Sequence, residues 1–451
     1  MFSLSEITRI VSGRRRAPLE RPVLGFSHDS RAVQTGDLFV ALRGQRTDGH
    51  RFLDQAYRRG AVGALVSDPS AVPHHAVNAI VVADPLHALQ ALAHAWRGRV
   101  RGHIFAITGS NGKTTTKLLL AHLLAGTWRV HAAAENYNTE IGLPLALLAM
   151  PEDTEVGVFE LGAERPGDIR LLAEILDPTA ALITGVGASH LAGFGTVEAV
   201  AEEKWSLVGS LPSDRVAFVN ADVPALRTRA ALRPSCSTVG LAHGAFRGRI
   251  VQDVPRLVLA TTDPSMTLDS PLLGGHNAVN VLLAAAGAMD IGLPPEQVES
   301  RLRTAPTPPH RLQRIDTPFG CVLDDTYNAN PASTSAALSV LASLGTADTQ
   351  RVFVFGDMLG LGAETDAAHR RIVGVAIQSG VDAILPVGDS ATHACRAAGD
   401  PRIIIRERTE VVRVVRRMAA ERSTIVLVKG SHGLAMGTLV DALRLGTAAH
   451  P

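Results

Sequence analysis

The stretch AITGSNGKTTTKLLLAHLL, residues 106–124, decides the fold because an apolar strand pattern runs through a glycine-bearing turn into a helical pattern. Small residues in such a turn let backbone N–H groups converge on phosphate oxygens at the start of the helix. Lys113 would neutralise the charge of the β- and γ-phosphates, and Thr114 would place a hydroxyl on a magnesium ion bridging them. The stretch is therefore typical of a P-loop that binds ATP or GTP with metal.

The turn departs from the general GxxxxGK[ST] pattern at its first position, where Ile107 replaces glycine, so it is a shortened TGxxGKT form. The alternative is an ordinary glycine turn with a solvated lysine. Because the residues lie at a strand-to-helix junction, we favour the nucleotide interpretation, which predicts a binding site but no particular reaction. The residues predicted to bind the nucleotide here are Gly109, Ser110, Asn111, Gly112, Lys113, Thr114 and Thr115.

Length and composition indicate a globular protein of several domains. At about 150 residues per domain, 451 residues suggest roughly three domains. Hydrophobic residues make up 46% of the chain and charged residues 19%, which excludes a disordered chain. With 44 Lys and Arg against 43 Asp and Glu, the net charge of +1 provides no general attraction for nucleic acid or an anionic membrane. We therefore expect neither a nucleic-acid partner nor stable membrane insertion.

The cysteines and the N-terminal segment predict a cytoplasmic location. Cys236, Cys321 and Cys395 are far apart and odd in number, which fits neither a disulfide framework nor a clustered zinc site. The opening MFSLSEITRIVSGRRR places its basic residues after its apolar ones and leads into no long apolar run. We expect a soluble, unprocessed monomer.

Strand and helix patterns predict an α/β fold of three domains. Residues 1–83 combine short strands, such as DLFVAL and ALVSD, with the helix GHRFLDQAYRRGA, as in a small N-terminal α/β domain. In residues 84–314 the runs HIFAITG, EVGVFELG, TAALITGVG and DRVAFVNAD alternate with helices, which predicts a central P-loop ATPase-type domain with a mainly parallel sheet. Residues 315–451 contain GCVLDDTY, RVFVFGDM, AILPVG, RIIIRE and TIVLVKGS, which predict a C-terminal Rossmann-like domain.

Two further residues lie where ligands bind in such sheets. Glu160 in VFELGAERPGDI falls at the carboxyl end of a predicted strand, where it could join Thr114 at a metal or serve as a helix cap or surface group. His190 in ITGVGASHLAGFG follows another strand within a glycine-rich loop, where an imidazole can reach a metal or phosphate, cap a helix or remain exposed.

Taken in order, the motifs resemble the Mur ligases, ATP-dependent enzymes that build the peptide of bacterial cell-wall precursors. The resemblance covers nearly the whole chain and agrees with the three-domain division. HDSRAVQTGDLFVALRGQRTDGHRF, DDTYNANPAS and FGDMLGLG are most similar to the family members that join D-alanyl-D-alanine to UDP-N-acetylmuramoyl-tripeptide. The motifs are TGSNGKTTT, NYNTEIGLPL, ELGAERPGDI, ASHLAGFG, AEEKWSL, GGHNAVN, PPHRLQ, DDTYNANPAS and VLVKGSHG.

The resemblance implies ATP and magnesium as the nucleotide and the metal, with Lys113 and Thr114 at the phosphates. Glu160 and His190 would help to hold a second metal. Lys204 of AEEKWSL matches the lysine that the family carries as a carbamate, although by itself it reads as a solvated helix lysine.

The same resemblance implies the remaining contacts to ATP and to the two substrates. Asn277 and Asn280 would lie at adenine, although Asn280 could simply cap or pack. Arg311 and Asp325 would reach the γ-phosphate and the ribose. The substrate-side residues would be Ser30 and Arg31 at the uridine nucleotide, Asn138 and Thr139 at its sugar region, and Asn328 and Asn330 at the dipeptide.

The implied reaction is an ADP-forming amide ligation in peptidoglycan synthesis that proceeds through an acyl phosphate. Thr139 stands where the family usually has a second Asn, ELG is often EMG, and FGDMLGLGAE lacks the usual Glu. A sibling ligase adding another amino acid is an alternative, but the diaminopimelate signature DNPR is absent. A folylpolyglutamate synthase and a P-loop nucleotide switch compete less well, and the N-K-x-D run of a guanine-reading switch is absent. The third residue of the tripeptide stays open.

Overall fold

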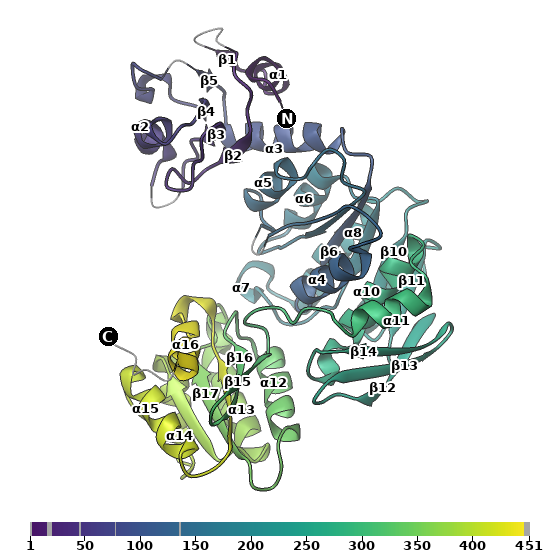
Figure 1. Cartoon of the computed structure of the whole chain (residues 1–451), viewed down its shortest axis with the longest axis vertical. Helices are drawn as coiled ribbons and strands as arrows, with labels where there is room; N and C mark the ends of the chain where they lie inside the picture. The colour runs from purple at the N-terminus through teal and green to yellow at the C-terminus, as the bar shows by residue number, and fades with distance from the viewer. Residues whose placement is uncertain (1, 16–19, 45–46, 77, 135–136, 446–451) are drawn as a thin grey trace. The chain divides into compact units, whose positions relative to one another are not determined.

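A computed structural model describes residues 2–15, 20–44, 47–76, 78–134 and 137–445. Its strands form three sheets with helices beside them, which confirms the predicted three-domain α/β class; the boundaries at 83/84 and 314/315 stay predictions (Figure 1). Contacts within the chain define two compact units, which are described separately. The first unit is residues 1–108, 124–182 and 205–217, and the second is residues 109–123, 183–204 and 218–451.

The N-terminal sheet belongs to the first unit and has the order β1-β5-β4-β3-β2. Its edge strand β1 is antiparallel and the others are parallel. The predicted strands DLFVAL and ALVSD are confirmed, whereas the predicted helix begins as a 3-10 turn, η1 (Gly49–Phe52), because Asp48 caps the backbone of His50. The bounds are β1 (Arg14–Arg15), β2 (Gly25–Ser27), β3 (Asp37–Val40), β4 (Gly63–Val66), β5 (Ala79–Val81), α1 (Leu4–Ile10), α2 (Leu53–Arg58) and η2 (Pro69–Ala71).

The central sheet has the order β14-β13-β12-β11-β10-β9-β6-β8-β7. Strand β8 pairs in parallel with β6 and β7, and β11 with β12, as predicted, but β13 pairs antiparallel with both β12 and β14. Buried and more exposed residues alternate along β13 and β14, as expected for a sheet with only one covered face. The bounds are β6 (His103–Thr108), β7 (Val130–Ala132), β8 (Val156–Glu160), β9 (Ala180–Ile183), β10 (Ala217–Asn220), β11 (Cys236–Gly240), β12 (Phe246–Gln252), β13 (Leu257–Thr262) and β14 (Ser265–Ser270).

The helices of this region are mostly apolar where they are buried, and α10 has a continuous buried run from Asn280 to Ala288. Such a helix is covered on most of its sides. The bounds are α3 (Pro85–Arg97), α4 (Lys113–Leu124), α5 (Gly142–Leu148), α6 (Asp168–Leu176), α7 (Leu191–Phe194), α8 (Val197–Gly209), α9 (Pro224–Ala230), η3 (Gly275–Asn277), α10 (Ala278–Asp290) and α11 (Pro295–Leu302).

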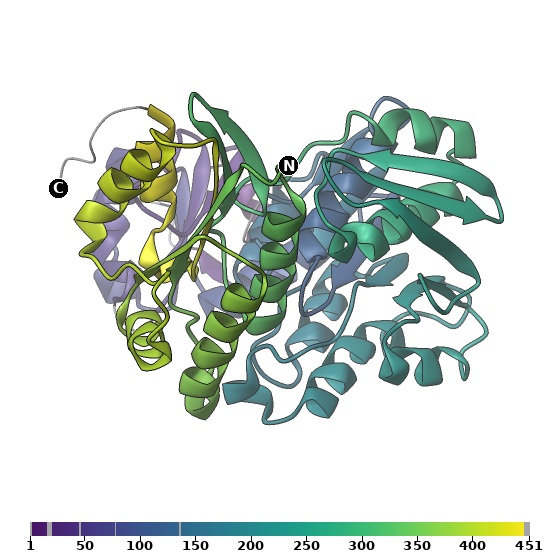
Figure 2. The same ribbon diagram turned by 90° about the horizontal axis from the view of Figure 1, so that it is seen from below.

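The C-terminal sheet belongs to the second unit and has the order β15-β16-β19-β17-β18, with only β15 antiparallel. Helices α12 to α14 share one buried cluster with the sheet and α15 and α16 share another, so helices cover both faces, as the Rossmann-like prediction requires (Figure 2). The bounds are β15 (Gln313–Thr317), β16 (Gly320–Asp325), β17 (Gln350–Gly356), β18 (Ala383–Val387), β19 (Thr424–Lys429), α12 (Pro331–Ser343), η4 (Gly362–Glu364), α13 (Thr365–Gln378), α14 (Asp389–Ala398), α15 (Arg408–Ala419), η5 (His432–Leu434) and α16 (Gly437–Leu445).

The strand predicted for RIIIRE is wrong. This segment forms a single bridge, between Ile403 and Ile384 of β18. The amide N of Ile384 donates to Arg402 O, and the amide N of Ile404 donates back to Ile384 O. Ile403 and Ile404 are partly buried against the two core clusters of the domain, which accounts for much of the hydrophobicity of the segment without a full strand.

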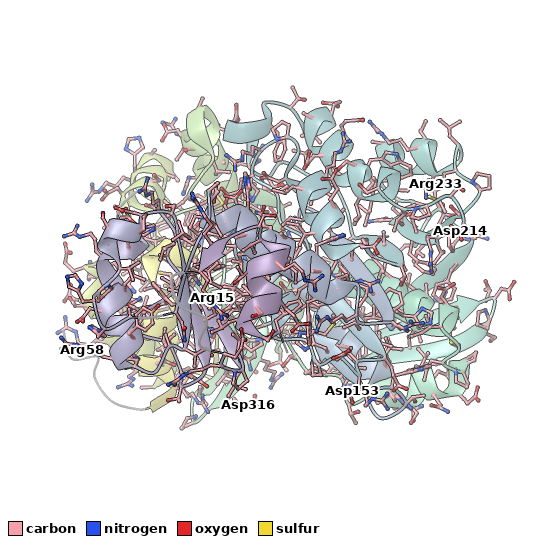
Figure 3. The ribbon with its side chains drawn as sticks, turned by 90° about the horizontal axis from the view of Figure 1, so that it is seen from above. Arg15, Arg58, Asp153, Asp214, Arg233 and Asp316 are labelled. Carbon is pink, nitrogen blue, oxygen red and sulfur yellow. The ribbon has the colours of Figure 1, made fainter. Side chains whose placement is uncertain are left out.

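The surface carries charges of both signs. Figure 3 labels Arg58, Asp153 and Asp316, whose side chains are 76%, 72% and 76% exposed. Across the part of the chain that the structure describes, no helix combines the length and the apolar character needed to cross a bilayer.

His131 on β7 should make the stability of the first unit pH-dependent. Its ring lies 5.7 Å from the Phe159 ring, and its buried Nε2 has no hydrogen-bond partner among the described residues. Burial lowers the pKa of His131 from its ordinary value. Because the folded state then binds a proton less readily than the unfolded state, stability is lost as the pH falls below about 6.5.

We therefore expect His131→Leu to flatten the dependence of the urea midpoint on pH between pH 8 and pH 5.5. The matched control is His87→Gln, which changes a histidine whose side chain is 79% exposed and should leave the slope as in the parent protein. An unchanged slope in His131→Leu would contradict the assignment.

Candidate functional site

The P-loop connects β6 to α4 and turns at two glycines. Gly109 has φ +151° and Gly112 has φ +83°, and both approach other side chains closely. A Cβ on Gly109 would lie 2.0 Å from Thr184 Oγ1, and one on Gly112 would lie 2.2 Å from Asn280 Oδ1. Only glycine therefore fits at these two positions.

Lys113 is the first residue of α4, and its side chain bends back across the loop. Its Nζ donates to Gly109 O at 2.8 Å. An ammonium group is thus held beside the N-terminus of a helix, whose backbone N–H groups already favour an anion. This arrangement suits phosphate binding and confirms the strand, turn and helix expected from the sequence.

The loop that carries His190 is tied to the P-loop through Ser110. The amide of Ser110 donates to Gly185 O at 3.0 Å, and its Oγ accepts from the amide of Gly187 at 3.0 Å. The Ser189 hydroxyl donates to Ser110 Oγ at 2.9 Å. His190 itself is exposed and has φ +51°. The structure therefore brings the two predicted loops together.

Arg311 reaches the first turn of α4. Its Nη2 donates to Thr114 Oγ1 at 2.8 Å, and its guanidinium lies 3.8 Å from the centre of the Tyr327 ring. Thr114 is buried, and Thr115, the next predicted residue, is buried as well. Two residues 197 positions apart thus meet where a phosphate would bind.

Asn277 and Asn280, predicted at adenine, are buried and bonded to each other. Asn280 Nδ2 donates to Asn277 Oδ1 at 3.0 Å, and Asn277 Nδ2 donates to Leu273 O at 2.9 Å. Thr116 Oγ1 donates to Asn280 Oδ1 at 3.4 Å. The pair therefore packs directly against α4 and Gly112.

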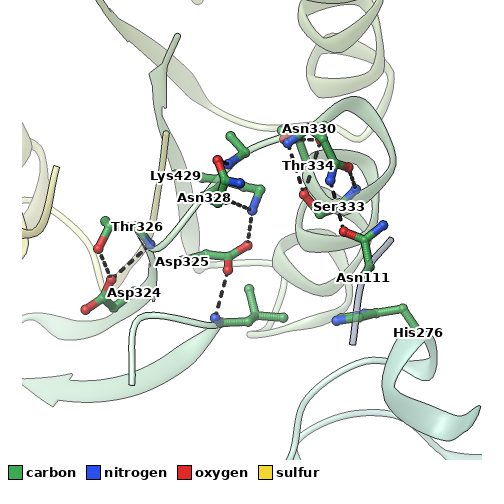
Figure 4. Close-up of polar contacts among 12 residues, drawn as sticks. Asn111, His276, Asp324, Asp325, Thr326, Asn328, Asn330, Ser333, Thr334 and Lys429 are labelled. Carbon is green, nitrogen blue, oxygen red and sulfur yellow. Dashed lines mark hydrogen bonds and ion pairs between the residues drawn. The ribbon is translucent and has the colours of Figure 1, made fainter. Parts of the chain in front are cut away.

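The predicted dipeptide residues have structural partners around the start of α12 (Figure 4). Asn330 caps α12 by accepting from the amide of Ser333 at 2.9 Å, and its Nδ2 donates to Asn111 Oδ1 of the P-loop at 2.9 Å. Asn328 is exposed, and its Oδ1 accepts from the amide of Ala329. The structure thus places Asn330 beside the nucleotide loop.

Asp325 is held by a buried lysine that the sequence analysis missed. Lys429 Nζ donates to Asp325 Oδ2 at 2.6 Å and to Asn328 O at 2.9 Å (Figure 4). The Lys429 side chain is 2% exposed. A buried ammonium needs such partners, so Lys429 joins two segments to which site residues had been assigned.

The small number of lysines in the sequence is the signal that could have singled out Lys429 as a functional residue. The chain has only four lysines among its 44 basic residues. Three of them, Lys117, Lys204 and Lys429, are fully buried, and Lys113 is half-buried. Every other Lys or Arg position is therefore an arginine, and each lysine is buried or partly buried.

Glu160 and Lys204, two of the predicted metal ligands, are both buried. Glu160 ends β8 in the first unit, and its Oε1 accepts from Asn138 Nδ2 at 2.6 Å. Thr139 Oγ1 accepts from the amide of Gly142, the first residue of α5. Lys204 lies on α8 in the second unit. Among the described residues, no group of three or more His, Cys, Asp or Glu could hold a metal ion.

Ser30 and Arg31 follow β2 in the N-terminal sheet. Ser30 is buried and its hydroxyl donates to Gln55 Oε1 at 2.7 Å. Arg31 is 82% exposed and pairs with Asp29 at 2.8 Å. The Arg31 guanidinium lowers the pKa of Asp29 to about 2, with help from the Arg31 backbone. Ser30 therefore faces inward, and Arg31 faces solvent.

Known proteins match the chain over almost its full length. Models of the Mur ligase catalytic domain, middle domain and glutamate ligase domain match residues 23–97, 107–288 and 310–432. UDP-N-acetylmuramoyl-tripeptide--D-alanyl-D-alanine ligase of Bacillus subtilis (strain 168) is 32% identical, with 98% of each chain covered. A crystal structure of MurF from Acinetobacter baumannii has TM-score 0.88 and 28% identity, with 98% of each chain covered. MurF ligase from Thermotoga maritima, in complex with ADP, has TM-score 0.83 and 25% identity and covers 93% of this chain and 97% of its own. By its sequence and its fold, the chain belongs to the Mur ligase family.

Proposed function

We propose that this protein is an ATP-dependent ligase that joins D-alanyl-D-alanine to UDP-N-acetylmuramoyl-tripeptide in peptidoglycan synthesis. One observation carries the proposal: Lys113 begins α4 and Arg311 donates to its neighbour Thr114, in a chain that matches a ligase of that name over 98% of its length. Two cations at a helix N-terminus suit the γ-phosphoryl group of a nucleotide.

ATP would be held by the P-loop and by residues packed around it. The loop from Gly109 to Thr115 supplies backbone donors at a helix N-terminus. Asn277 and Asn280 offer amide groups for a base edge, and Asp325 offers a carboxylate for ribose hydroxyls. These residues would have to exchange part of their present hydrogen bonds for bonds to the nucleotide.

Magnesium fits the donor chemistry of the proposed residues. It prefers oxygen ligands, which Thr114 and Glu160 provide. His190 is exposed on a loop that is bonded to the P-loop, and Lys204 would contribute oxygen atoms as a carbamate. When bound, magnesium would neutralise charge on the phosphates.

The reaction would begin when a carboxylate oxygen of the tripeptide attacks the γ-phosphorus of ATP. The bond to the β,γ-bridging oxygen breaks, which releases ADP and leaves an acyl phosphate. The amine of the dipeptide then attacks the acyl carbon, and a tetrahedral intermediate loses inorganic phosphate and a proton to give the amide. Lys113 and Arg311 would stabilise charge on the transferred phosphoryl group.

The two substrates would bind at different parts of the chain. Arg31, which is exposed and cationic, suits the diphosphate of the uridine nucleotide, with Ser30 beside it. Asn138 and Thr139 would contact the sugar region. The start of α12, with Asn328 and Asn330, would receive the dipeptide.

We place the reaction in the cytoplasm and expect a monomer. Cys236, Cys321 and Cys395 are free thiols, as in a reducing compartment. Burial raises the pKa of Cys395 to about 12, so its thiol is unreactive at neutral pH.

Phosphate release from ATP, measured while each substrate is omitted in turn, tests the proposed function. We expect release only when the UDP-tripeptide and D-alanyl-D-alanine are both present, with a product heavier by the dipeptide in mass spectrometry. Release with a single amino acid would instead identify a sibling ligase. Release without either substrate would indicate a nucleotide switch and would contradict the proposal.

A further inference from the structure

Arg311 is carried by a strained turn. The residues on its two sides, His310 and Leu312, have φ of +58° and +54°. Residues with side chains rarely adopt this left-handed conformation, because the Cβ crowds the backbone. Two such residues around one arginine persist only where surrounding contacts hold them.

Two consecutive carboxylates at the end of β16 supply these contacts. His310 Nδ1 donates to Asp324 Oδ2 at 2.7 Å, and the amide of Leu312 donates to Asp325 Oδ1 at 3.1 Å. A third bond runs from the amide of Tyr327 to His310 O at 3.0 Å. Each strained residue is thus bonded to its own carboxylate.

Both carboxylates are fixed within the C-terminal domain. The Asp324 side chain is 2% exposed, and its Oδ1 accepts from the amide and the hydroxyl of Thr326 at 3.1 and 2.7 Å (Figure 4). Asp325 is paired with the buried Lys429. The turn is therefore anchored to the sheet and not merely to neighbouring loop residues.

The Arg311 side chain depends on this turn for its direction. Its Nε is buried and has no hydrogen-bond partner among the described residues. Within the described part of the chain, the guanidinium is oriented by its stacking on Tyr327 and by one hydrogen bond, to Thr114. Because a planar fork needs a defined direction to meet phosphoryl oxygens, a loosened turn would misalign it.

We propose that His310 and Asp324 are a positioning pair that holds this turn so that Arg311 faces the γ-phosphoryl group of ATP. The inference rests on the proposed function of Arg311. The pair acts through Arg311 and touches no reacting atom itself.

His310→Gly tests the pair because glycine accepts the positive φ and keeps the main-chain oxygen but lacks the imidazole. We expect kcat to fall about 30-fold, in line with a small misplacement of a catalytic group. Affinity for a non-hydrolysable ATP analogue should fall about tenfold, while affinity for ADP, which has no γ-phosphate, stays unchanged in calorimetry. His310→Asn should restore part of the loss, since Asn tolerates this conformation and its amide can donate to Asp324.

Ser12→Gly is the matched control because Ser12 is also a left-handed residue, with φ +49°, and lies outside the site. It should show parent kcat and parent affinities. In a double-mutant cycle, His310→Gly combined with Arg311→Ala should be no worse than Arg311→Ala alone. The inference would be overturned if the loss of kcat in the double variant equalled the product of the two single losses. It would also be overturned if His310→Gly weakened the binding of ADP as much as the binding of the analogue.

Failure of the inference can be told from failure of the proposed function. If Arg311→Ala leaves the affinity for the analogue unchanged, the proposed role of Arg311 is wrong, and the inference falls with it. If Arg311→Ala weakens analogue binding, but the loss in the double variant equals the product of the two single losses, then His310 does not act through Arg311. The positioning role is then wrong, and the proposed function stands. Thermal unfolding of each variant, with an unchanged midpoint expected for the half-exposed His310, excludes misfolding as the cause.

Discussion

Replacing Lys113 with alanine should lower the rate of ligation about 1,000-fold, the upper end of what one preorganised charge donor contributes to a transition state. The ammonium group crosses the P-loop and donates to Gly109 O, and in the proposed site it would lie where negative charge develops on the transferred phosphoryl group. Lys113→Arg should lose nearly as much, because a longer planar group cannot occupy the same close position. The measurement is kcat from coupled phosphate release with both substrates saturating.

Arg170→Ala is the control for lost charge. Arg170 is a cation on α6 whose side chain is 75% exposed and pairs with Glu174, so its removal should leave kcat within twofold of the parent value. If Lys113→Ala retained more than about a tenth of the parent rate, the assignment of Lys113 to the phosphates would be wrong.

The second large effect is expected at Gly112. Gly112→Ala would place a Cβ 2.2 Å from Asn280 Oδ1, so the loop or the asparagine must move. Because the loop would supply the phosphate-binding backbone groups of the proposed site, affinity for ATP should fall about 100-fold. Isothermal calorimetry with ATP and with ADP would measure the loss.

Gly126 offers a closely matched control for Gly112. Its φ is +85° against +83° for Gly112, but a Cβ there meets nothing within 4 Å. Both alanine variants carry the same backbone penalty, roughly 1 kcal/mol of stability, so their difference isolates the clash with Asn280. Equal ATP affinity in the two variants would show that the close approach does not matter for binding.

Local patterns predicted the elements that carry the site. The strand, glycine turn and helix around Lys113 follow from neighbouring residues, and the parallel strands of the C-terminal sheet follow from apolar runs. The strand prediction for RIIIRE was wrong because a segment buried against a core and a strand paired in a sheet can have the same apolar sequence. Periodicity alone cannot separate these two environments.

The contacts that complete the site could not be predicted in this way. Lys429 and Asp325 are 104 residues apart in the sequence, and Asn330 and Asn111 are 219 apart. Patterns among neighbouring residues therefore cannot predict either hydrogen bond. The resemblance supplied roles for Asp325 and Asn330 but none for Lys429, His310 or Asp324. The capping role of Asn330 was readable, since Asn followed by proline and then serine at the third helical position is a helix start signal.

Because the chain has so few lysines, reagents that modify amines can react with only a few of its side chains. Reagents that acylate amines react with lysine side chains and not with arginine, and three of the four lysine side chains are fully enclosed. Lys113 is therefore the most accessible lysine amine in the folded protein. Acylation at this residue, followed by peptide mass mapping, would report occupancy of the P-loop without a radioactive or fluorescent nucleotide.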